Sequence, residues 1–240
     1  QGFSINNFKG YIDISGFITR YTDMMEFMFG FYDIDGSDIS TTELQSIVIN
    51  NGIGILSNYL GARSTNIQNA NIPGFEVSIV GQGNITENIS FSTLAGYTYI
   101  NPTPTDADSL YLLTFSNPNI ENPKNTILKY RNKHMVKIDF QIDYKKFALG
   151  LSSRYSSLME NVDDVFVSPI AGIEILPGYG SYRNSRMTGD LVFDTRLAYK
   201  INKKSRFSLI VNNLLNREYT NRPGNVLPPR TIVWQYSLKF

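Results

Sequence analysis

The 240-residue sequence contains no cysteine and a single histidine, His134. The missing cysteines exclude a disulfide framework, a thiol nucleophile and cysteine-based zinc or iron–sulfur sites, and one histidine cannot form a multi-histidine metal site. Charged residues make up only 18% of the chain, below the roughly 25% that is usual for soluble domains. The 22 basic and 21 acidic residues nearly cancel and no basic block is present, which argues against a nucleic-acid-binding protein.

Long apolar runs are also missing, because no stretch approaches the roughly 18 residues that a membrane-spanning helix requires. Aromatic residues are plentiful at 13% of the chain, which argues against disorder. The first residue is Gln1, and no charged segment followed by an apolar segment comes after it, so the sequence predicts no signal peptide. We expect the chain to be either processed or a piece of a longer protein.

Strict alternation of apolar and polar residues, the pattern of a β-strand, recurs along the chain. At the C-terminus it places Ile232, Trp234, Tyr236, Leu238 and Phe240 on one face of a strand. The pattern predicts eight strands: a run from about Lys9 to Phe29, then segments near residues 75–79, 89–99, 136–144, 147–155, 191–199, 207–211 and 231–240. Several hold the pattern for about ten residues, the length that a tilted strand needs to cross a bilayer.

The predicted connections alternate between short and long. Tight turns near residues 86–88, 145–146 and 202–205 alternate with loops of about 30–61, 102–128, 156–186 and 216–229. This alternation is typical of an up-and-down barrel in an outer membrane, which has short periplasmic turns and longer outer loops. The last strand would then end in the periplasm, and residues 1–8 would lie at a periplasmic turn or on the strand before it.

One long loop contains a helix signal. Ser40 lies three residues before Glu43, which is the spacing of a capping box. Leu44, Ile47 and Val48 would follow on one helical face. The sequence therefore predicts a short helix in this loop, which needs tertiary contacts for its stability.

A soluble β-sandwich would also show alternating strands, but three features favour a membrane barrel. The strands are long, the connections alternate regularly, and the polar face mixes Ser, Gly, Gln and Asn with charges, which suits a water-filled lumen. Aromatic residues also gather near the predicted strand ends, where Tyr and Trp prefer the membrane interface. The sequence predicts an all-β, antiparallel, up-and-down transmembrane barrel whose apolar face contacts lipid.

Several motifs resemble the TonB-dependent outer-membrane receptors. The tail carries N-N-L-L-N-R-E-Y at 212–219, R-P-G at 222–224, P-R at 229–230 and a terminal Phe240. The segments 73–77 and 95–99 resemble a strand pair of that family, and 21–26 resembles the top of another strand. The resemblance implies a barrel of about 22 strands with an N-terminal plug domain. Residues 1–240 would be the C-terminal portion of that barrel, without the plug and the upstream strands.

The resemblance further implies a Gram-negative outer-membrane transporter or receptor for a scarce nutrient of the siderophore, vitamin, sugar or peptide class. TonB would act through the plug, membrane lipid would surround the barrel, and Phe240 would be read by the outer-membrane assembly machinery. Ligand contacts would lie in the four outer loops. We expect no enzymatic activity and no cofactor. The alternatives are a stand-alone eight-stranded barrel with a structural or adhesive role, a membrane-embedded lipid-modifying enzyme with His134 as base, and a soluble binding module.

Other candidates for chemistry are weak. Asp33, Asp35 and Asp38 group the oxygen ligands that calcium prefers, but the nearby glycine comes too early for an EF-hand loop and a plain acidic turn explains them better. Gly81-Gln82-Gly83 is an incomplete dinucleotide fingerprint and is better explained by a nearby turn. Inward-facing charges would pair across strands, face the plug or be solvated; they are Lys137, Asp139, Asp143, Arg154, Asp194, Arg196, Lys200 and Lys239. Arg217, Arg222 and Arg230 flank the last outer loop, where they could attract an anion or pair with Glu218.

Overall fold

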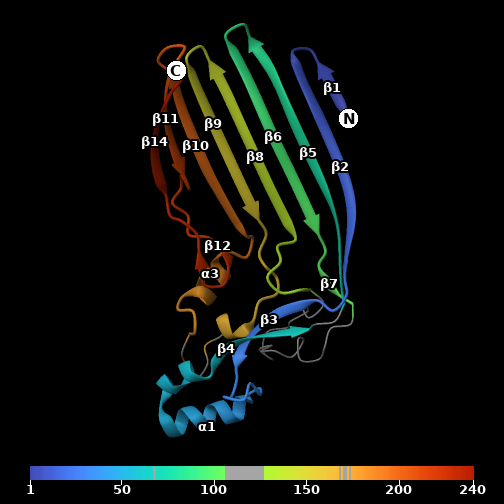
Figure 1. The fold of residues 1–240 in the computed structure, drawn as a ribbon, viewed down its shortest axis with the longest axis vertical. Coiled ribbons are helices and arrows are strands. Elements are labelled where there is room, and N and C mark those ends of the chain that lie inside the picture. The colour runs from blue at the N-terminus through green and yellow to red at the C-terminus, as the bar shows by residue number, and fades with distance from the viewer. Residues whose placement is uncertain (67–68, 106–126, 168, 170–171, 173) are drawn as a thin grey trace.

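The computed structural model describes residues 1–66, 69–105, 127–167, 169, 172 and 174–240. One antiparallel sheet dominates it (Figure 1). In order across the sheet its strands are β1 (Gly2–Ile5), β2 (Phe8–Tyr21), β5 (Ala70–Thr86), β6 (Ile89–Ile100), β8 (His134–Tyr144), β9 (Phe147–Ser156), β10 (Asp190–Lys200), β11 (Ser205–Asn212) and β14 (Thr231–Leu238). The short strand β7 (Thr103–Pro104) also pairs with β5. Because β1 and β14 form the two edges and do not pair with each other, the barrel is not closed.

The antiparallel strands predicted from alternation are confirmed, and β5 reaches 17 residues. One predicted boundary is wrong. The run from Lys9 to Phe29 divides into β2 and a separate strand, β3 (Met25–Phe31), which pairs with β4 (Leu60–Asn66) outside the main sheet. Asp23, between the two, has φ +52°. A residue in this left-handed region cannot continue a strand, so the chain leaves the sheet there.

The two faces of the sheet have different chemistry. On β14, Trp234 is 64% exposed and Ile232 60%, and β2 exposes Ile14 and Ile18 on the same face. In the part of the chain that the structure describes, the other strands form two small pairs in the connections, β3–β4 and β12 (Thr220–Arg222) with β13 (Asn225–Val226). The apolar face is therefore free to contact lipid, as expected of an outer-membrane barrel. We call the opposite, polar face the lumenal face.

Glycines on the lipid-facing side leave room for phenyl rings. The Phe8 ring stacks on Phe91 with centroids 5.5 Å apart and contacts Phe3 at 5.6 Å. A Cβ on Gly81 would lie 2.2 Å from the Phe8 ring, and one on Gly10 would lie 2.5 Å from the Phe3 ring. Within the Gly81-Gln82-Gly83 segment, the first glycine thus provides space for a ring lying flat on β5.

The connections alternate in length, as predicted. Short turns join β1 to β2, β5 to β6, β8 to β9 and β10 to β11, and these turns and both termini lie at one end of the sheet (Figure 1). We call this the turn end. The long connections lie at the opposite end, the loop end. By the rule for outer-membrane barrels, the turn end faces the periplasm and the loop end faces outward.

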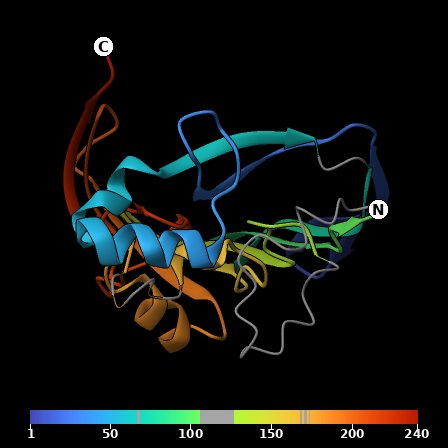
Figure 2. The ribbon, with the colours of Figure 1, turned by 90° about the horizontal axis from the view of Figure 1, so that it is seen from below.

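The loop end holds most of the remaining elements: α1 (Thr41–Asn51), the 3₁₀ turns η1 (Ile53–Asn58) and η3 (Asp164–Phe166), α3 (Tyr179–Ser185), and the hairpin β12 (Thr220–Arg222) with β13 (Asn225–Val226). The predicted capping box starts α1: Ser40 Oγ accepts from Glu43 N at 3.2 Å, and Glu43 Oε2 accepts from Ser40 N at 2.9 Å. Figure 2, seen from the loop end, shows the β3–β4 ribbon and α1 lying across this end of the sheet. Among the described residues, no helix is long and apolar enough to cross a membrane.

The buried apolar side chains gather at the loop end. One cluster consists of Met28, Ala70, Ile72 and Leu128, and a second of Phe31, Leu44, Leu56 and Val165. The second cluster joins β3, α1 and η1 to the connection between β9 and β10. The outer loops therefore form a packed assembly with its own core, which lies at the end of the main sheet and not across its two faces.

Candidate functional site in the lumen and outer loops

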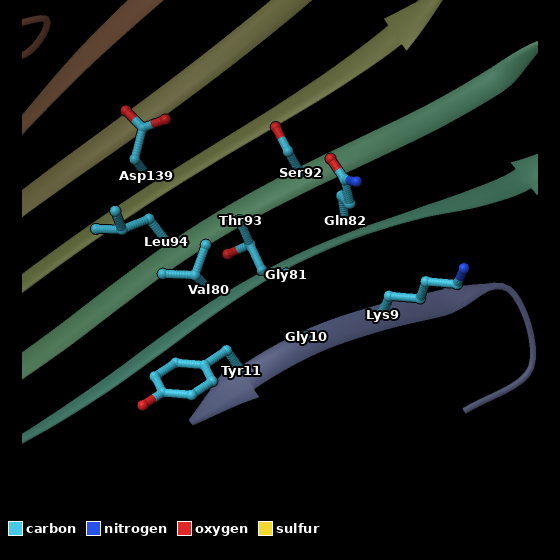
Figure 3. Close-up of a pocket in the computed structure, with 10 residues that line it drawn as sticks. All are labelled: Lys9, Gly10, Tyr11, Val80, Gly81, Gln82, Ser92, Thr93, Leu94 and Asp139. Carbon is cyan, nitrogen blue, oxygen red and sulfur yellow. The ribbon is translucent and has the colours of Figure 1, made fainter. Parts of the chain in front are cut away.

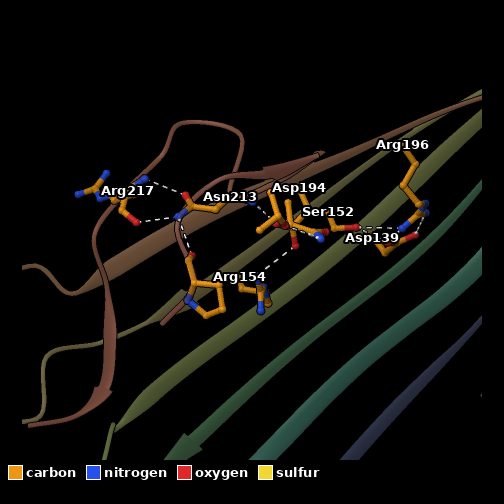
Figure 4. Close-up of polar contacts among 10 residues, drawn as sticks. Asp139, Ser152, Arg154, Asp194, Arg196, Asn213 and Arg217 are labelled. Atoms are coloured by element: carbon orange, nitrogen blue, oxygen red, sulfur yellow. Dashed lines mark hydrogen bonds and ion pairs between the residues drawn. The ribbon is translucent and has the colours of Figure 1, made fainter. Parts of the chain in front are cut away.

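Charged side chains pair across strands on the lumenal face (Figure 4). Arg196 on β10 reaches over β9 to Asp139 on β8, donating from Nη1 at 2.8 Å and from Nη2 at 2.9 Å. Gly150 on β9 is the direct register partner of Arg196, whereas Asp139 is opposite Ser152, so the guanidinium crosses β9 diagonally beside Gly150. A Cβ on Gly150 would be 2.8 Å from the Arg196 guanidinium. A side chain at position 150 would occupy part of the space that the guanidinium crosses, so Arg196 would have to shift to keep the pair.

A second pair links the lumen to the last outer loop. Arg154 Nη2 lies 3.1 Å from Asp194 Oδ2, and Asp194 Oδ1 accepts from the backbone N of Asn213 at 2.7 Å. Asn213 is only 2% exposed, and its amide exchanges hydrogen bonds with the Arg217 backbone at 2.7 and 2.8 Å. Of the alternatives left open for the inward charges, cross-strand pairing thus applies to four of them, and the network continues into the loop before β14.

A hollow of about 510 Å³ lies against the other half of the sheet (Figure 3). Its lumenal side chains include Tyr11, Val80 and Leu94, which are directly paired in register on β2, β5 and β6 and are 51%, 46% and 49% exposed. The same row ends at Asp139. An exposed apolar row on a polar face is suited to contact with another part of a protein.

Buried charges join three outer connections. Asp163, 1% exposed, accepts hydrogen bonds from the Lys129 ammonium and the Tyr130 hydroxyl, and from Phe29 N at 3.4 Å. Nearby, Arg131 pairs with Glu26 at 2.6 Å, and burial raises the pKa of Glu26 against the lowering effect of that arginine. Removing either Asp163 or Lys129 would leave the other charge buried without this partner. The contact between Asp163 and Lys129 therefore fixes the outer connections relative to one another.

A cavity of about 620 Å³ lies between α3 and the β12–β13 hairpin. It is lined by apolar, aromatic, hydroxyl and charged groups, among them Leu176, Tyr179, Ser181, Tyr182, Arg186, Glu218 and Val226. The Tyr182 hydroxyl donates to Asp190 and accepts from Thr220 N at 3.2 Å; burial and the bond to Asp190 raise its pKa to about 12. The volume of this cavity and its mixture of apolar and polar lining groups match those of small-molecule binding sites.

The predicted calcium ligands make local contacts instead. Asp33 and Asp35 accept from the backbone N of Ile34 at 2.7 Å and of Ser37 at 2.9 Å, and Asp38 pairs with Arg63 at 3.2 Å. Among the described residues, no group of three His, Cys, Asp or Glu side chains could hold a metal ion.

The other predicted site residues are spread over the molecule. His134 lies on β8 with Nδ1 2.9 Å from the Tyr97 hydroxyl, and the Tyr99 ring packs on it at 5.1 Å. Arg217 belongs to the Asn213 network, and Phe240 is fully exposed at the end of the chain. Most of the predicted ligand loop 102–128 lies outside the described residues.

Sequence reasoning missed Asp163, Tyr182 and Asp190. Asp163 and its partner Lys129 are 34 residues apart, so the local sequence does not show the pair. Tyr182 and Asp190 are only eight residues apart, but they match no motif that would distinguish them from ordinary loop residues.

Comparison with known proteins identifies the family of the chain. A family model described as "TonB dependent receptor-like, beta-barrel" matches residues 2–214. The chain belongs to the TonB-dependent receptor family. It is therefore a Gram-negative outer-membrane protein from a family of transport receptors and not of enzymes. None of the curated proteins matches it.

Solved structures show the same fold at low identity. The ferric-catecholate import receptor Fiu of E. coli K12 in its closed form gives a TM-score of 0.55 at 18% identity, over 98% of this chain and 25% of Fiu. The copper transporter OprC gives a TM-score of 0.58 at 14% identity, over 100% of this chain and 30% of OprC. The siderophore receptor PiuA of Acinetobacter baumannii gives a TM-score of 0.51 at 16% identity, over 99% of this chain and 27% of PiuA. This TonB-dependent receptor chain thus spans less than a third of the length of these structures.

Proposed function

We propose that this chain is the C-terminal part of the barrel of an active transporter for a scarce nutrient, energised through TonB. Residues 1–240 supply wall, lumenal surface and outer loops. Upstream strands of the same polypeptide complete the barrel, and a plug domain occupies its lumen. The family match and the fraction of the solved structures that the chain covers support this proposal.

The observation that carries the proposal is an open sheet with one apolar face and one polar, ion-paired face. A closed barrel exposes only its outer face to lipid, so β1 and β14 need further strands between them. The alternative of a stand-alone eight-stranded barrel requires the two edges of this sheet to meet, and they do not pair.

The nutrient binds at the loop end in this proposal. The similar structures include import receptors for ferric siderophores and a copper transporter, which supports a chelated metal as the cargo. The cavity between α3 and β12–β13 belongs to two of the four predicted ligand loops, and its aromatic, hydroxyl and charged groups suit a polar, ring-containing ligand.

Uptake by cells that express the whole polypeptide tests the transport role. We expect ferric-siderophore or copper uptake to be lost when either the receptor or TonB is deleted, and to return with the receptor gene in trans. Uptake that is independent of TonB would overturn the proposed energisation. A closed, heat-modifiable barrel formed by residues 1–240 alone would support the stand-alone alternative instead.

A pair of helix-surface serines tests the cavity. Ser181 lines it on α3, whereas Ser46 is exposed on α1 away from it. Ser181→Trp fills part of the cavity, so we expect a higher half-saturation concentration for uptake. Ser46→Trp adds the same bulk elsewhere and should leave uptake unchanged. Equal behaviour of the two variants would remove the cavity from the ligand path.

A further inference from the structure

The turn end of the sheet is strongly basic. Eight Lys or Arg residues lie within four residues of a short turn or of the C-terminal end. Only two acidic residues, Glu87 and Asp143, lie within the same distance. Seven of the eight form what we call the basic cluster: Lys145, Lys146, Lys200, Lys203, Lys204, Arg206 and Lys239. All seven are exposed.

Backbone contacts hold the members of the basic cluster together. Lys200 N donates to Lys146 O at 2.8 Å, which joins the β8–β9 turn to the end of β10. Lys239 N donates to Lys204 O, also at 2.8 Å, which joins the end of β14 to the β10–β11 turn. Lys200 and Arg206 are direct cross-strand partners. Like charges placed opposite each other in this way are destabilising.

The cluster is not neutralised within the part of the chain that the structure describes. All seven of the ion pairs there lie elsewhere: five at the loop end and two in the middle of the lumenal face. The nearest acid in sequence, Asp143, accepts a hydrogen bond from Gln141 at 2.9 Å and forms no ion pair with a described residue. The fold therefore concentrates positive charge without supplying the matching negative charge.

The orientation of the side chains decides what kind of partner can reach them. Lys200, Arg206 and Lys239 occupy lumenal positions by strand alternation, and the other four cations lie on turns. At this level the lipid-facing positions carry aromatic residues, namely Tyr144, Phe147, Tyr199, Phe207 and Tyr236. Anionic lipid headgroups could contact only the turns. A partner in the mouth of the lumen reaches the three cations at lumenal positions as well as the turns. Among the turn lysines, Lys145 has its Nζ 5.2 Å from the ring centroid of the lipid-facing Tyr144.

We propose that the basic cluster binds an acidic segment of the protein domain that occupies the lumen, at the periplasmic mouth of the barrel. The inference rests on the proposed function, because it requires a lumenal domain. Charge complementarity carries it: an Asp- or Glu-rich segment relieves the repulsion between Lys200 and Arg206 and contacts the turn lysines from the same side.

Zero-length crosslinking of the whole receptor tests the proposal. A carbodiimide joins a lysine amine to a carboxylate only where the two are in contact, and mass spectrometry identifies both residues. We expect crosslinks from Lys200 and Lys239 to Asp or Glu residues of the lumenal domain. The double variant Lys200→Gln/Lys239→Gln should lose them. Lys137→Gln, which removes an exposed lumenal lysine outside the cluster, should not.

A functional readout accompanies the crosslinks. In the double variant, the lumenal domain should become protease-accessible at a lower salt concentration than in the wild type, because salt screens the remaining pairs. The Lys137→Gln receptor should retain the wild-type salt concentration. Unchanged accessibility in the double variant would contradict a role of the cluster in holding the domain.

Two further outcomes would overturn the inference. One is a complete absence of crosslinks between the cluster and the lumenal domain. The other is loss of co-purified anionic phospholipid when the four turn lysines are changed to Gln, in a receptor whose protease accessibility does not change in the Lys200→Gln/Lys239→Gln variant, which would assign the cluster to lipid. If uptake is TonB-dependent but crosslinks are absent, this inference alone fails. If the polypeptide has no lumenal domain, the proposed function fails with it.

Discussion

The loop end and the turn end of this receptor segment differ in whether their charged side chains are paired. At the loop end, Asp163 is buried against Lys129 and Tyr130, and Glu26 pairs with Arg131. At the turn end, Lys200 and Arg206 face each other without an acidic partner among the described residues. The long connections have enough chain to fold back, form a core and pair their own charges. Two- to four-residue turns cannot do so, and their charges remain available to a partner.

The largest expected effect comes from removing the carboxylate that joins the outer loops. Asp163→Ala leaves Lys129 buried without this partner, which should destabilise the loop assembly by about 3–5 kcal/mol. Hydrogen exchange of the β3 amides in the whole receptor measures the change. Asp38→Ala breaks the exposed pair with Arg63 and should cost about 1 kcal/mol or less. Equal effects of the two variants would show that burial does not distinguish these pairs.

The capping box of α1 should give a smaller effect. Ser40→Ala removes the acceptor for Glu43 N and should destabilise α1 by about 1 kcal/mol. Ser46→Ala, in the interior of the same helix, should be neutral or slightly stabilising because alanine has the higher helix propensity. Exchange rates of the α1 amides distinguish the two, and a protected α1 in the Ser40 variant would contradict the prediction.

On the lumenal face, replacing a glycine should cost stability only where a charged side chain crosses the strand beside it. Gly150→Ala places a Cβ against the Arg196 guanidinium and should weaken the partly exposed pair with Asp139, at a cost of about 0.5–1 kcal/mol. Gly96→Ala, on the same face of β6, meets no atom within 4 Å and is the matched control. Urea unfolding of the two variants gives the comparison. A Gly96 variant as unstable as the Gly150 variant would point to backbone strain instead.

At the turn end, removing a charge should help rather than harm. Lys200→Gln relieves the repulsion with Arg206 and should stabilise the β10–β11 hairpin by roughly 0.5 kcal/mol in a barrel without the lumenal domain. The gain should disappear at high salt. Lys200→Arg keeps the charge and should show no gain. A loss of stability in the Gln variant would mean that a neutralising group is already present in the barrel wall.

Local signals in the sequence predicted the strands, the tight turns and the capped helix. Alternation and the Ser40–Glu43 spacing depend on neighbouring residues, so they are readable without a structure. The separation of β3 from β2 was missed, because it depends on one backbone angle at Asp23. Asp163 was missed because its partners come from two other connections. Arg196 and Asp139 were among the eight inward charges predicted from alternation, but the sequence did not indicate which of them pair. Only the register shows that the guanidinium crosses β9 beside Gly150.

The rings over Gly10 and Gly81 have a consequence for the surrounding bilayer. Phe3 and Phe8 occupy space that Gly10 and Gly81 leave open, and their rings contact each other and Phe91, so these packed positions set the level of the rings along the strands. Lysine and arginine side chains elsewhere can extend toward the water to absorb a change in membrane thickness, whereas these rings stay at that level. In a thinner or thicker membrane, the lipid next to β1 and β2 must therefore stretch or compress to match the protein.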